Sequence, residues 1–521
     1  MKKILKIAGK VILAGLILLL ILAIINLRDP YKGYKADMKI IRADSSYLSA
    51  GFAAVKITPE IPDRWTDADN DAKYIPRKGD TFTDGNGNGK FDAVWIAGFG
   101  NKRAANGVHD DLWARTMIID DGQTRLAIVA LDLIGLMNNE IIDIRKQIPA
   151  SAGITYLIVT STHNHEAPDM LGLWGQSPFR SGINRKYTEF VKKQIVKSIE
   201  TAVADMRPAR FEFSEDLSGA SSLVKDTRDP QVFDYGLRII KITDRETGAT
   251  LGTVIAWGNH PETLWGKNLI ITSDFPHYVR EYVENGISLN DSSLVQGTGG
   301  ICLYVNGAVG GLMTTPPSLT ITDPVTGEKF SEPSFDKANA EGKQVAMLAL
   351  KAMEKPELAV EQAGISLIVK TIILPVHNRL FRLASTLGIF KRGTVGWMKM
   401  RSEVAVFNIG PISFATLPGE VYPEILNGGI EAPEGRDFQI PPVEVPPVRG
   451  MMKGKIKFIL GLANDEIGYI IPKSQWDIRK PYAYGKDKPQ YGEENSLGPE
   501  TAPLLHAALK EMLVEINQDK R

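Results

Sequence analysis

Residues 154–169, ITYLIVTSTHNHEAPD, contain the pattern that decides the fold. An apolar, β-branched run ends at Ser161, and two histidines, His163 and His165, follow in a polar segment. Short runs of this kind predict a buried strand. On an extended chain a spacing of two points side chains to opposite faces, so one histidine is expected as a ligand and the other beside it, unless the backbone turns at Asn164. The stretch predicts a polar site at the end of a strand.

The same alternation of apolar runs and polar turns continues along the chain. Expected strands lie at 51–57, 115–120, 125–136, 237–243, 251–259, 301–307, 365–376 and 404–419. Apolar residues spaced three and four apart predict helices at 184–206, 335–355 and 501–518. The expected fold class is α/β (α+β): a single large catalytic domain with mixed β-sheets and flanking helices.

Composition excludes several classes of function. The 521 residues carry 61 basic and 61 acidic side chains, so no positive excess supports nucleic-acid binding. Cys302 is the single cysteine, which rules out an internal disulfide and a cysteine-based zinc knuckle. No HExxH pattern occurs, which excludes the usual metalloprotease helix.

The N-terminus is expected to contact a membrane. Lysines at 2, 3, 6 and 10 precede an uncharged apolar run at 11–25. A cleaved signal peptide is the alternative, but no small-x-small cleavage site follows the run. An uncleaved signal-anchor is therefore expected at 1–27, a polar linker at 28–48 and the hydrolase domain at 49–521. The lysines place the N-terminus in the cytoplasm and the domain outside it, periplasmic or extracellular.

A segment rich in Asp, Asn and Gly resembles a calcium loop. Four oxygen side chains occupy positions 1, 3, 5 and 9 of an EF-type loop: Asp84, Asn86, Asn88 and Asp92. Gly89 falls at position 6, where such a loop turns sharply, but Trp95 replaces the glutamate at position 12. Asp67, Asp69 and Asp71 offer further oxygens. The two interpretations are a structural Ca²⁺ site and a plain Gly/Asn turn.

A third histidine has the same setting as the first pair. His260, in AWGNHPETL (256–264), follows an apolar run and precedes a proline. A lone histidine is usually an ordinary polar or core residue, so each is weak evidence. Histidines at strand ends in a chain with abundant carboxylates make a zinc hydrolase plausible.

Several blocks together resemble the neutral/alkaline (non-lysosomal) ceramidase family. They occur in order at 51–59, 107–122, 126–135, 161–169, 256–284, 414–424, 461–472 and 495–502. STHNHEAPD resembles the family's His-x-His motif, FATLPGEVYPE its Pro-Gly-Glu motif, and GLANDEIGYIIP and NSLGPETA its last two blocks. The likeness runs from about residue 50 to 515, which implies the family's catalytic domain and a lipid-amide hydrolase.

The resemblance implies one catalytic Zn²⁺. Its ligands would be two histidines, a glutamate and a tyrosine: His163, His260, Glu420 and Tyr469. His165 would be a proton-transfer or oxyanion group beside the metal. Arg228, in DTRDPQ, best matches the family's substrate-orienting arginine. Taken singly, Glu420 is better explained as a helix-capping carboxylate and Tyr469 as a strand aromatic, and only the matches together, in sequence order, favour zinc.

The chain departs from the family at the motif serine. The equivalent segment is YVNGAVGGLMTT (304–315), which places Gly311 at the serine position. Glycine has no hydroxyl, although the backbone N–H groups of Gly310 and Gly311 are candidates for an oxyanion site. The family's C-terminal immunoglobulin-like domain is also expected to be absent. These differences put the ceramide substrate in question.

Three functions are compatible with these features. The first is a zinc amidohydrolase of the N-acylsphingosine type, acting on an N-acyl lipid or related substrate. The second is an esterase of the same fold, and the third is a non-catalytic surface protein that keeps the metal. Residues 379–400, apolar and basic, are explained either as a surface lying on the membrane near the site or as a buried helix with basic ends.

Overall fold

The computed structural model describes residues 2–289 and 292–518. Its larger sheet has nine strands, with a parallel pair at each end and antiparallel pairing between. In spatial order these are β17 (Ile301–Asn306), β13 (Thr250–Trp257), β12 (Leu237–Asp244), β10 (Arg207–Asp216), β3 (Ser49–Lys56), β7 (Trp113–Asp120), β8 (Arg125–Leu131) and β9 (Tyr156–Ser161), with β21 (Leu358–Val360) also paired to β10.

The second sheet has five strands. In order they are β1 (Met38–Ile40), β23 (Ile365–Pro375), β24 (Lys399–Ile409), β25 (Ile412–Thr416) and β27 (Lys457–Leu460). The described helices are α1 (Lys2–Asn26), α2 (Asn138–Gln147), α3 (Arg185–Ala204), α4 (Phe275–Asn285), α5 (Phe335–Met353), α6 (Arg379–Thr386), α7 (Pro423–Asn427), α8 (Val448–Met451) and α9 (Thr501–Gln518).

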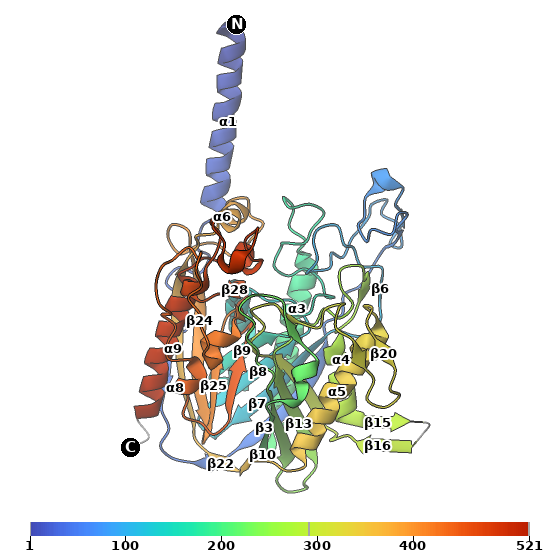
Figure 1. The fold of residues 1–521 in the computed structure, drawn as a ribbon, viewed down its shortest axis with the longest axis vertical. Coiled ribbons are helices and arrows are strands. Elements are labelled where there is room, and N and C mark those ends of the chain that lie inside the picture. Colours follow the sequence, from blue (N-terminus) through green and yellow to red (C-terminus); the bar gives the residue numbers. More distant parts are fainter. Residues whose placement is uncertain (1, 290–291, 519–521) are drawn as a thin grey trace.

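These elements form four layers. Alternate residues of the two sheets face each other in one apolar core, as the strand period of two requires. The outer face of the larger sheet is covered by α2 and α3 at one end and by α4 and α5 at the other. The outer face of the smaller sheet packs against α8 and α9. Figure 1 shows this red and orange part of the chain beside the blue and green strands of the larger sheet. The α/β prediction with mixed sheets and flanking helices is confirmed.

An aromatic row sets the register of the smaller sheet. Phe407 and Phe414 are cross-strand partners with ring centroids 4.3 Å apart, and Phe414 pairs with Phe458 at 4.8 Å. All three rings are almost fully buried. Such pairs stabilise a sheet by about 0.5–1.5 kcal/mol each beyond their buried area. They align β25 with β27, and both strands lead into the functional site.

Two short strand pairs also continue toward the functional site. β26 (Glu420–Val421) runs parallel to β28 (Tyr469–Ile470), and β11 (Lys225–Asp226) pairs with β18 (Met313–Thr314). The other short pairs are β2 (Ser46–Tyr47) with β22 (Gln362–Ala363), β4 (Arg64–Thr66) with β5 (Thr81–Thr83), β6 (Gly107–Val108) with β14 (Ile270–Ile271), β15 (Gly286–Leu289) with β16 (Ser292–Gln296), and β19 (Ile321–Thr322) with β20 (Lys329–Phe330).

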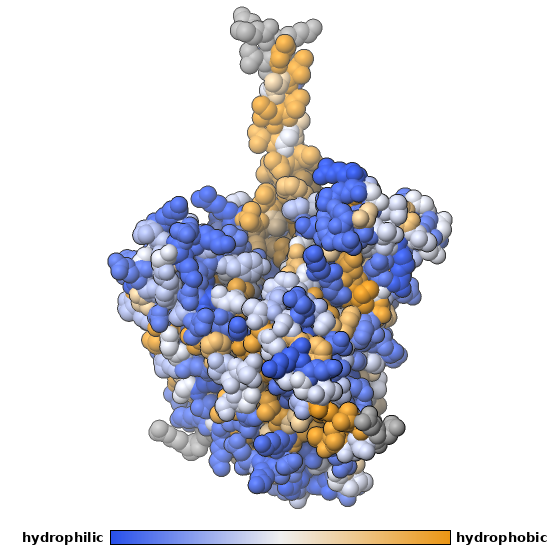
Figure 2. All heavy atoms as spheres, turned by 45° about the vertical axis from the view of Figure 1, so that its right-hand side comes forward, coloured by the Kyte–Doolittle hydropathy of each residue, from blue (hydrophilic) through white to orange (hydrophobic). Residues whose placement is uncertain are grey.

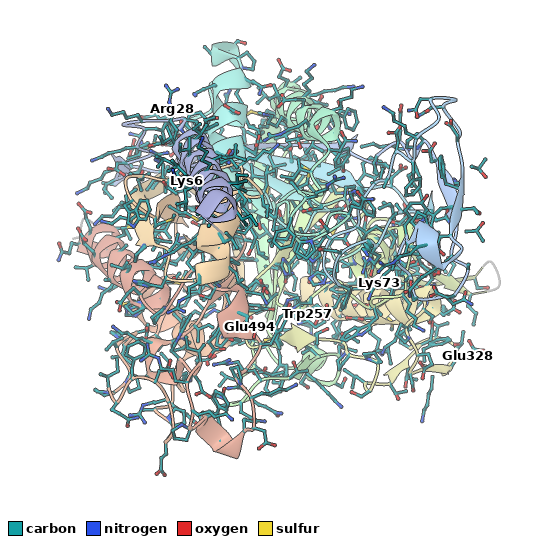
Figure 3. All side chains as sticks on the ribbon, turned by 90° about the horizontal axis from the view of Figure 1, so that it is seen from above. Lys6, Arg28, Lys73, Trp257, Glu328 and Glu494 are labelled. Carbon is teal, nitrogen blue, oxygen red and sulfur yellow. The ribbon has the colours of Figure 1, made fainter. Side chains whose placement is uncertain are left out.

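The N-terminal helix stands away from the domain. Its segment Lys6–Asn26 has 21 residues and a mean hydropathy of 2.8. By length and composition it is able to cross a membrane, a test that a signal sequence also passes. Figure 1 shows α1 projecting from the domain as a single helix, and Figure 2 shows that its surface is largely apolar. In Figure 3 the helix, marked by Lys6 and Arg28, rises over one side of the domain rather than its centre.

Residues 28–48 pack against the domain, although a linker was expected. Strand β1 extends the five-stranded sheet by pairing with β23, and β2 pairs with β22. Asp29 forms a two-pronged contact with Arg401, with N–O distances of 2.6 and 3.1 Å. Backbone pairing and an ion pair provide these contacts, and the overall polarity of the segment gives no sign of them.

Candidate metal centre

The predicted ligands all follow the carboxyl ends of strands. His163 comes two residues after β9, and His260 comes three residues after β13. Glu420 and Tyr469 lie on β26 and β28, shortly after β25 and β27. The two sheets meet at this edge, where Ser161 donates its N–H to the Leu462 carbonyl. Ligands from both halves of the chain therefore converge on one point.

The two predicted ligand histidines, His163 and His260, are each oriented by a backbone carbonyl. Nδ1 of His163 lies 2.8 Å from the Ile134 oxygen, and Nδ1 of His260 lies 2.7 Å from the Met313 oxygen. A carbonyl only accepts hydrogen bonds, so Nδ1 must carry the proton in both rings. The neutral rings then present the Nε2 lone pair to the centre, as metal-binding histidines commonly do.

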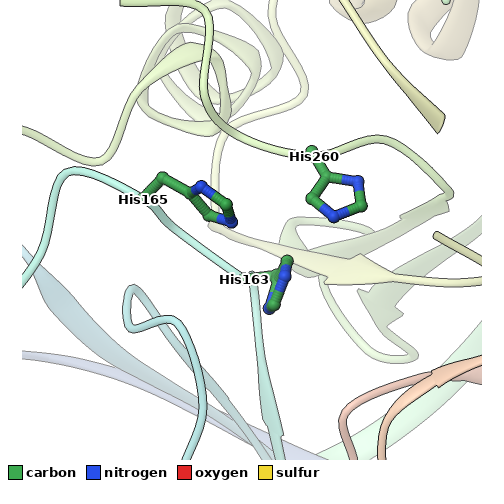
Figure 4. Close-up of side chains that lie close together, drawn as sticks. All are labelled: His163, His165 and His260. Atoms are coloured by element: carbon green, nitrogen blue, oxygen red, sulfur yellow. The ribbon is translucent and has the colours of Figure 1, made fainter. Parts of the chain in front are cut away.

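The backbone at His163 adopts a conformation that side chains seldom take. Its φ is +65°, in the left-handed region. This turn occurs at His163 itself, one residue before the position where the sequence suggested it. As a result His163, His165 and His260 gather in one place, with one ligand atom of each within 4.8 Å of the others. Figure 4 shows the three rings around a common space.

A buried asparagine ties the two histidine loops together. The side-chain N–H groups of Asn306 donate to the carbonyls of Thr162 and Asn259, the residues that precede His163 and His260. Its side-chain oxygen accepts from the Asn259 N–H. Asn306 is fully buried. It is the last residue of β17, so the larger sheet sets the spacing of the two histidine loops.

Glu420 completes the centre from the other sheet. One of its oxygens lies 3.1 Å from Nε2 of His260 and 3.4 Å from Nε2 of His163. Glu420 and Tyr469 are register partners, and the two side chains interact directly. Burial raises the pKa of Tyr469 far above its usual value, and the nearby carboxylate raises it further.

This donor set fits a cation. Two Nε2 lone pairs and a carboxylate oxygen converge, and three acceptors cannot satisfy one another without a positive charge or a proton between them. Ligands about 2.0–2.1 Å from a tetrahedral zinc lie about 3.3 Å apart, close to the two measured separations. Burial lowers the pKa of His260, but the contacts with Glu420 and the Met313 carbonyl and the charge of Glu262 together raise it above its usual value, so protons compete with a metal here.

His165 stands beside this centre rather than facing Glu420. Its Nδ1 lies 3.1 Å from a carboxylate oxygen of Glu262. The other Glu262 oxygen accepts a 2.6 Å hydrogen bond from the Thr314 hydroxyl. Burial lowers the pKa of His165 to about 4, so the ring is neutral at physiological pH. The dyad of His165 and Glu262 is therefore suited to proton transfer.

A largely apolar pocket opens onto the centre. His163, His165, Glu420 and Tyr469 form its polar end. The remaining wall is mainly aliphatic and aromatic, with contributions from Ile134, Met137, Leu171, Leu173, Trp174, Phe381, Phe390, Met400, Ile467, Tyr491 and Leu497. An apolar channel that ends at a few convergent polar groups is typical of a site for a ligand with a hydrocarbon part.

The fold is shared with solved structures. A scan against protein-family models finds no match. The crystal structure of neutral ceramidase from Pseudomonas aeruginosa superimposes with a TM-score of 0.61 at 14% identity, covering 91% of this chain and 75% of that one. This chain has a neutral ceramidase-like fold. A ceramidase described as complexed with C2 gives the same TM-score and identity, with 76% of its chain covered.

Arg228 does not reach the pocket of this ceramidase-like domain, contrary to the substrate-orienting role predicted for it. It is 3% exposed, and its two terminal nitrogens each lie 2.9 Å from an oxygen of Glu493. Its guanidinium also stacks over the Tyr422 ring. Because the terminal nitrogens are already used, the geometry assigns Arg228 to holding the 493 region against the ligand strand β26.

Replacing Arg228 is expected to affect folding more than substrate binding. Arg228→Met leaves the buried Glu493 carboxylate without its ion-pair partner, which costs about 3–5 kcal/mol of unfolding free energy. The double variant Arg228→Met/Glu493→Leu should recover most of that loss. Chemical denaturation of the purified chain measures both. Unchanged stability in the single variant would restore the substrate-orienting role.

The glycine turn gives limited support to the predicted oxyanion site. The Gly310 N–H donates to the Val421 carbonyl at 2.9 Å, so it is not free for an oxyanion, and that part of the prediction is corrected. Gly311 has φ +76°, and a Cβ there would approach the Asp226 carboxylate at 3.0 Å. The turn therefore accepts glycine better than the serine that the family carries.

The calcium-like loop adopts a tight acidic turn. The Asp84 carboxylate accepts the N–H groups of Gly87, Asn88 and Gly89, while Asn86 and Asn88 donate side-chain N–H groups to Asp92. Lys78 bridges two carboxylates of the Asp67, Asp69 and Asp71 group. These contacts suit either interpretation, so calcium remains a prediction for Asp84, Asn86, Asn88 and Asp92.

Two acidic residues of the site had been assigned no role from sequence. Glu262 follows His260 by two residues, so the HPE triplet was the available signal. Glu466 lines the pocket near Glu420, and burial raises its pKa well above the usual range. One Glu466 oxygen accepts from the Gly468 N–H. A protonated carboxyl at this place would donate a hydrogen bond inside the pocket.

Proposed function

We propose that this protein is a membrane-anchored zinc amidohydrolase that cleaves the amide of an N-acyl lipid. The observation that carries the proposal is the convergence of the Nε2 atoms of His163 and His260 on the Glu420 carboxylate at the end of an apolar pocket. The ceramidase-like fold supports the same reaction class. Tyr469 is the proposed fourth ligand, because it contacts Glu420 and lines the pocket.

The residues around the centre have separate roles in the proposed hydrolysis. Zinc, when bound, supplies Lewis acidity that polarises a carbonyl and strengthens water as a nucleophile. His165 takes a proton from the attacking water and passes it to the leaving nitrogen, while Glu262 holds the ring and stabilises its charged form. The carbon–nitrogen bond breaks, a carbon–oxygen bond forms, and a fatty acid and an amine leave. The apolar wall holds the acyl chain.

A membrane-anchored orientation is part of the proposal. α1 has the length of a bilayer span, and the lysines at its start favour a cytoplasmic N-terminus. The domain then lies in the periplasm or outside the cell. The hydrogen bond from the Asn26 side chain, at the end of α1, to the Thr386 carbonyl favours a retained helix over a cleaved signal.

Fatty-acid release from mixed N-acyl lipids tests the reaction. The full chain, loaded with Zn²⁺, is expected to release fatty acid, and removal of the metal by a chelator should abolish release until Zn²⁺ is restored. The same preparation is tested on esters of the same acyl chains, because Gly311 replaces the family's serine. Ester cleavage without amide cleavage would favour the esterase, and no cleavage of either would favour a non-catalytic protein.

A further inference from the structure

The end of α1 is fixed to the domain without a flexible connection. The Leu27 carbonyl accepts hydrogen bonds from both the N–H and the hydroxyl of Thr394, at 3.2 and 2.9 Å. The Asn26 side chain donates to the Thr386 carbonyl at the end of α6, and Asp29 pairs with Arg401. α1 and α6 pack directly on each other. The position of α1 therefore determines where α6 and its following loop lie.

The length of α1 gives the level of the membrane surface. Its 21-residue apolar segment ends at Asn26. At 1.5 Å per residue it measures about 32 Å, close to the thickness of the hydrocarbon core. The boundary of the core then falls at Asn26 and Leu27. Because these residues contact Thr386 and Thr394, residues 379–400 lie at the level of the lipid headgroups.

This segment exposes large apolar side chains that no described part of the chain covers. Leu380 is 68% exposed, Leu383 47% and Trp397 77%. Leu380 and Leu383 belong to α6, and Trp397 lies three residues beyond Thr394. Tryptophan and leucine are typical of surfaces that insert into the headgroup region. We call these three residues the apolar rim.

Basic side chains accompany the apolar rim. Arg379, Lys391 and Lys399 are exposed, and no described residue forms an ion pair with them. Cations beside exposed apolar groups are attracted to anionic lipid headgroups. The charge of this face therefore matches a bilayer that contains anionic lipid.

The same segment forms one wall of the pocket. Phe381 and Phe390 pack edge to face with ring centroids 5.1 Å apart, and both line the pocket together with Met400. Phe381 lies between the rim residues Leu380 and Leu383 in sequence. We propose that the apolar rim inserts into the leaflet from which α1 emerges and holds the pocket against it, so that a lipid passes from the bilayer to the metal centre along Phe381 and Phe390. The passage of substrate rests on the proposed function, whereas the insertion does not.

The depth of the rim is measured on the full chain in vesicles of phosphatidylcholine and phosphatidylglycerol. Trp397→Cys carries a nitroxide label, and Leu294→Cys is the control, because Leu294 is 51% exposed on β16 at the end of the domain remote from α1. Native Cys302 is fully buried and stays unlabelled. The label at 397 should collide with oxygen more than with a water-soluble nickel complex, and the label at 294 should do the reverse. Equal exposure to water at both positions would overturn the proposal.

A second measurement concerns substrate entry. Leu380→Ser/Leu383→Ser should lower hydrolysis of an N-acyl lipid in vesicles at least tenfold, with no change on a short-chain amide in solution. Leu294→Ser should change neither. Unchanged turnover in vesicles, or an equal loss on both substrates, would contradict entry past the rim. If the wild type cleaves neither substrate, the proposed function fails while the depth measurement still decides the insertion.

Discussion

The double variant His163→Ala/His260→Ala is expected to bind no zinc, whereas the wild type binds about one zinc ion per chain. These residues supply the two Nε2 atoms that lie 3.4 and 3.1 Å from one Glu420 oxygen. Without them a single carboxylate and a tyrosine remain, which cannot hold a borderline-soft ion. Hydrolysis should fall by about 10³-fold or more, because the Lewis-acid contribution is several kcal/mol.

The measurement is elemental analysis of chains purified from zinc-supplemented medium, combined with turnover. His377→Ala is the matched control, since His377 is exposed and lies outside the pocket lining. Thermal unfolding adds a readout independent of activity: chelator should lower the midpoint of the wild type and leave the double variant unchanged. Full metal content in the double variant would refute the ligand set.

The strand ends were predictable from sequence for a physical reason. Apolar β-branched runs such as Tyr156–Ser161 form strands because both faces are buried, and the first polar residues after them must lie at a sheet edge. The positions of His163 and His260 follow from that rule alone. Glu420 and Tyr469 do not, and resemblance to a known family was needed to select them from many buried candidates. The structure brings all four together.

The remaining features depend on contacts between distant parts of the chain. Glu262 acquires its role because β18 places Thr314 beside it and β9 places His165 beside it. The contact between Arg228 and Glu493 joins residues 265 positions apart, so the sequence around Arg228 gives no sign of it. The pairing of the 28–48 segment with β23 and β22 is equally remote, and its polar composition alone predicts a linker. In each case the composition of a segment indicates its local structure, but nothing in it indicates which distant residues it contacts.

His165→Gln is expected to retain the metal and lose activity, by about 10²–10⁴-fold in kcat. The three histidines are close enough for two ligand sets, one with Glu420 and Tyr469 and one with all three rings. The contacts favour the first, because Nε2 of His163 and Nε2 of His260 lie 3.4 and 3.1 Å from a Glu420 oxygen, whereas the carboxylate in contact with His165 is Glu262. Glutamine keeps the size and polarity of the side chain but cannot carry the proton.

Glu262→Gln provides the matched comparison, because it removes the charge next to His165 and leaves the ring in place. Its kcat should fall less than that of His165→Gln, by about 10–100-fold, while metal content and KM stay close to wild type. If the two residues act as a unit, the double variant should be no slower than His165→Gln alone, since the carboxylate acts only through the ring. Loss of the metal from His165→Gln would instead make His165 a ligand and give the three-histidine set. A multiplicative loss in the double variant would show that Glu262 acts on the substrate directly.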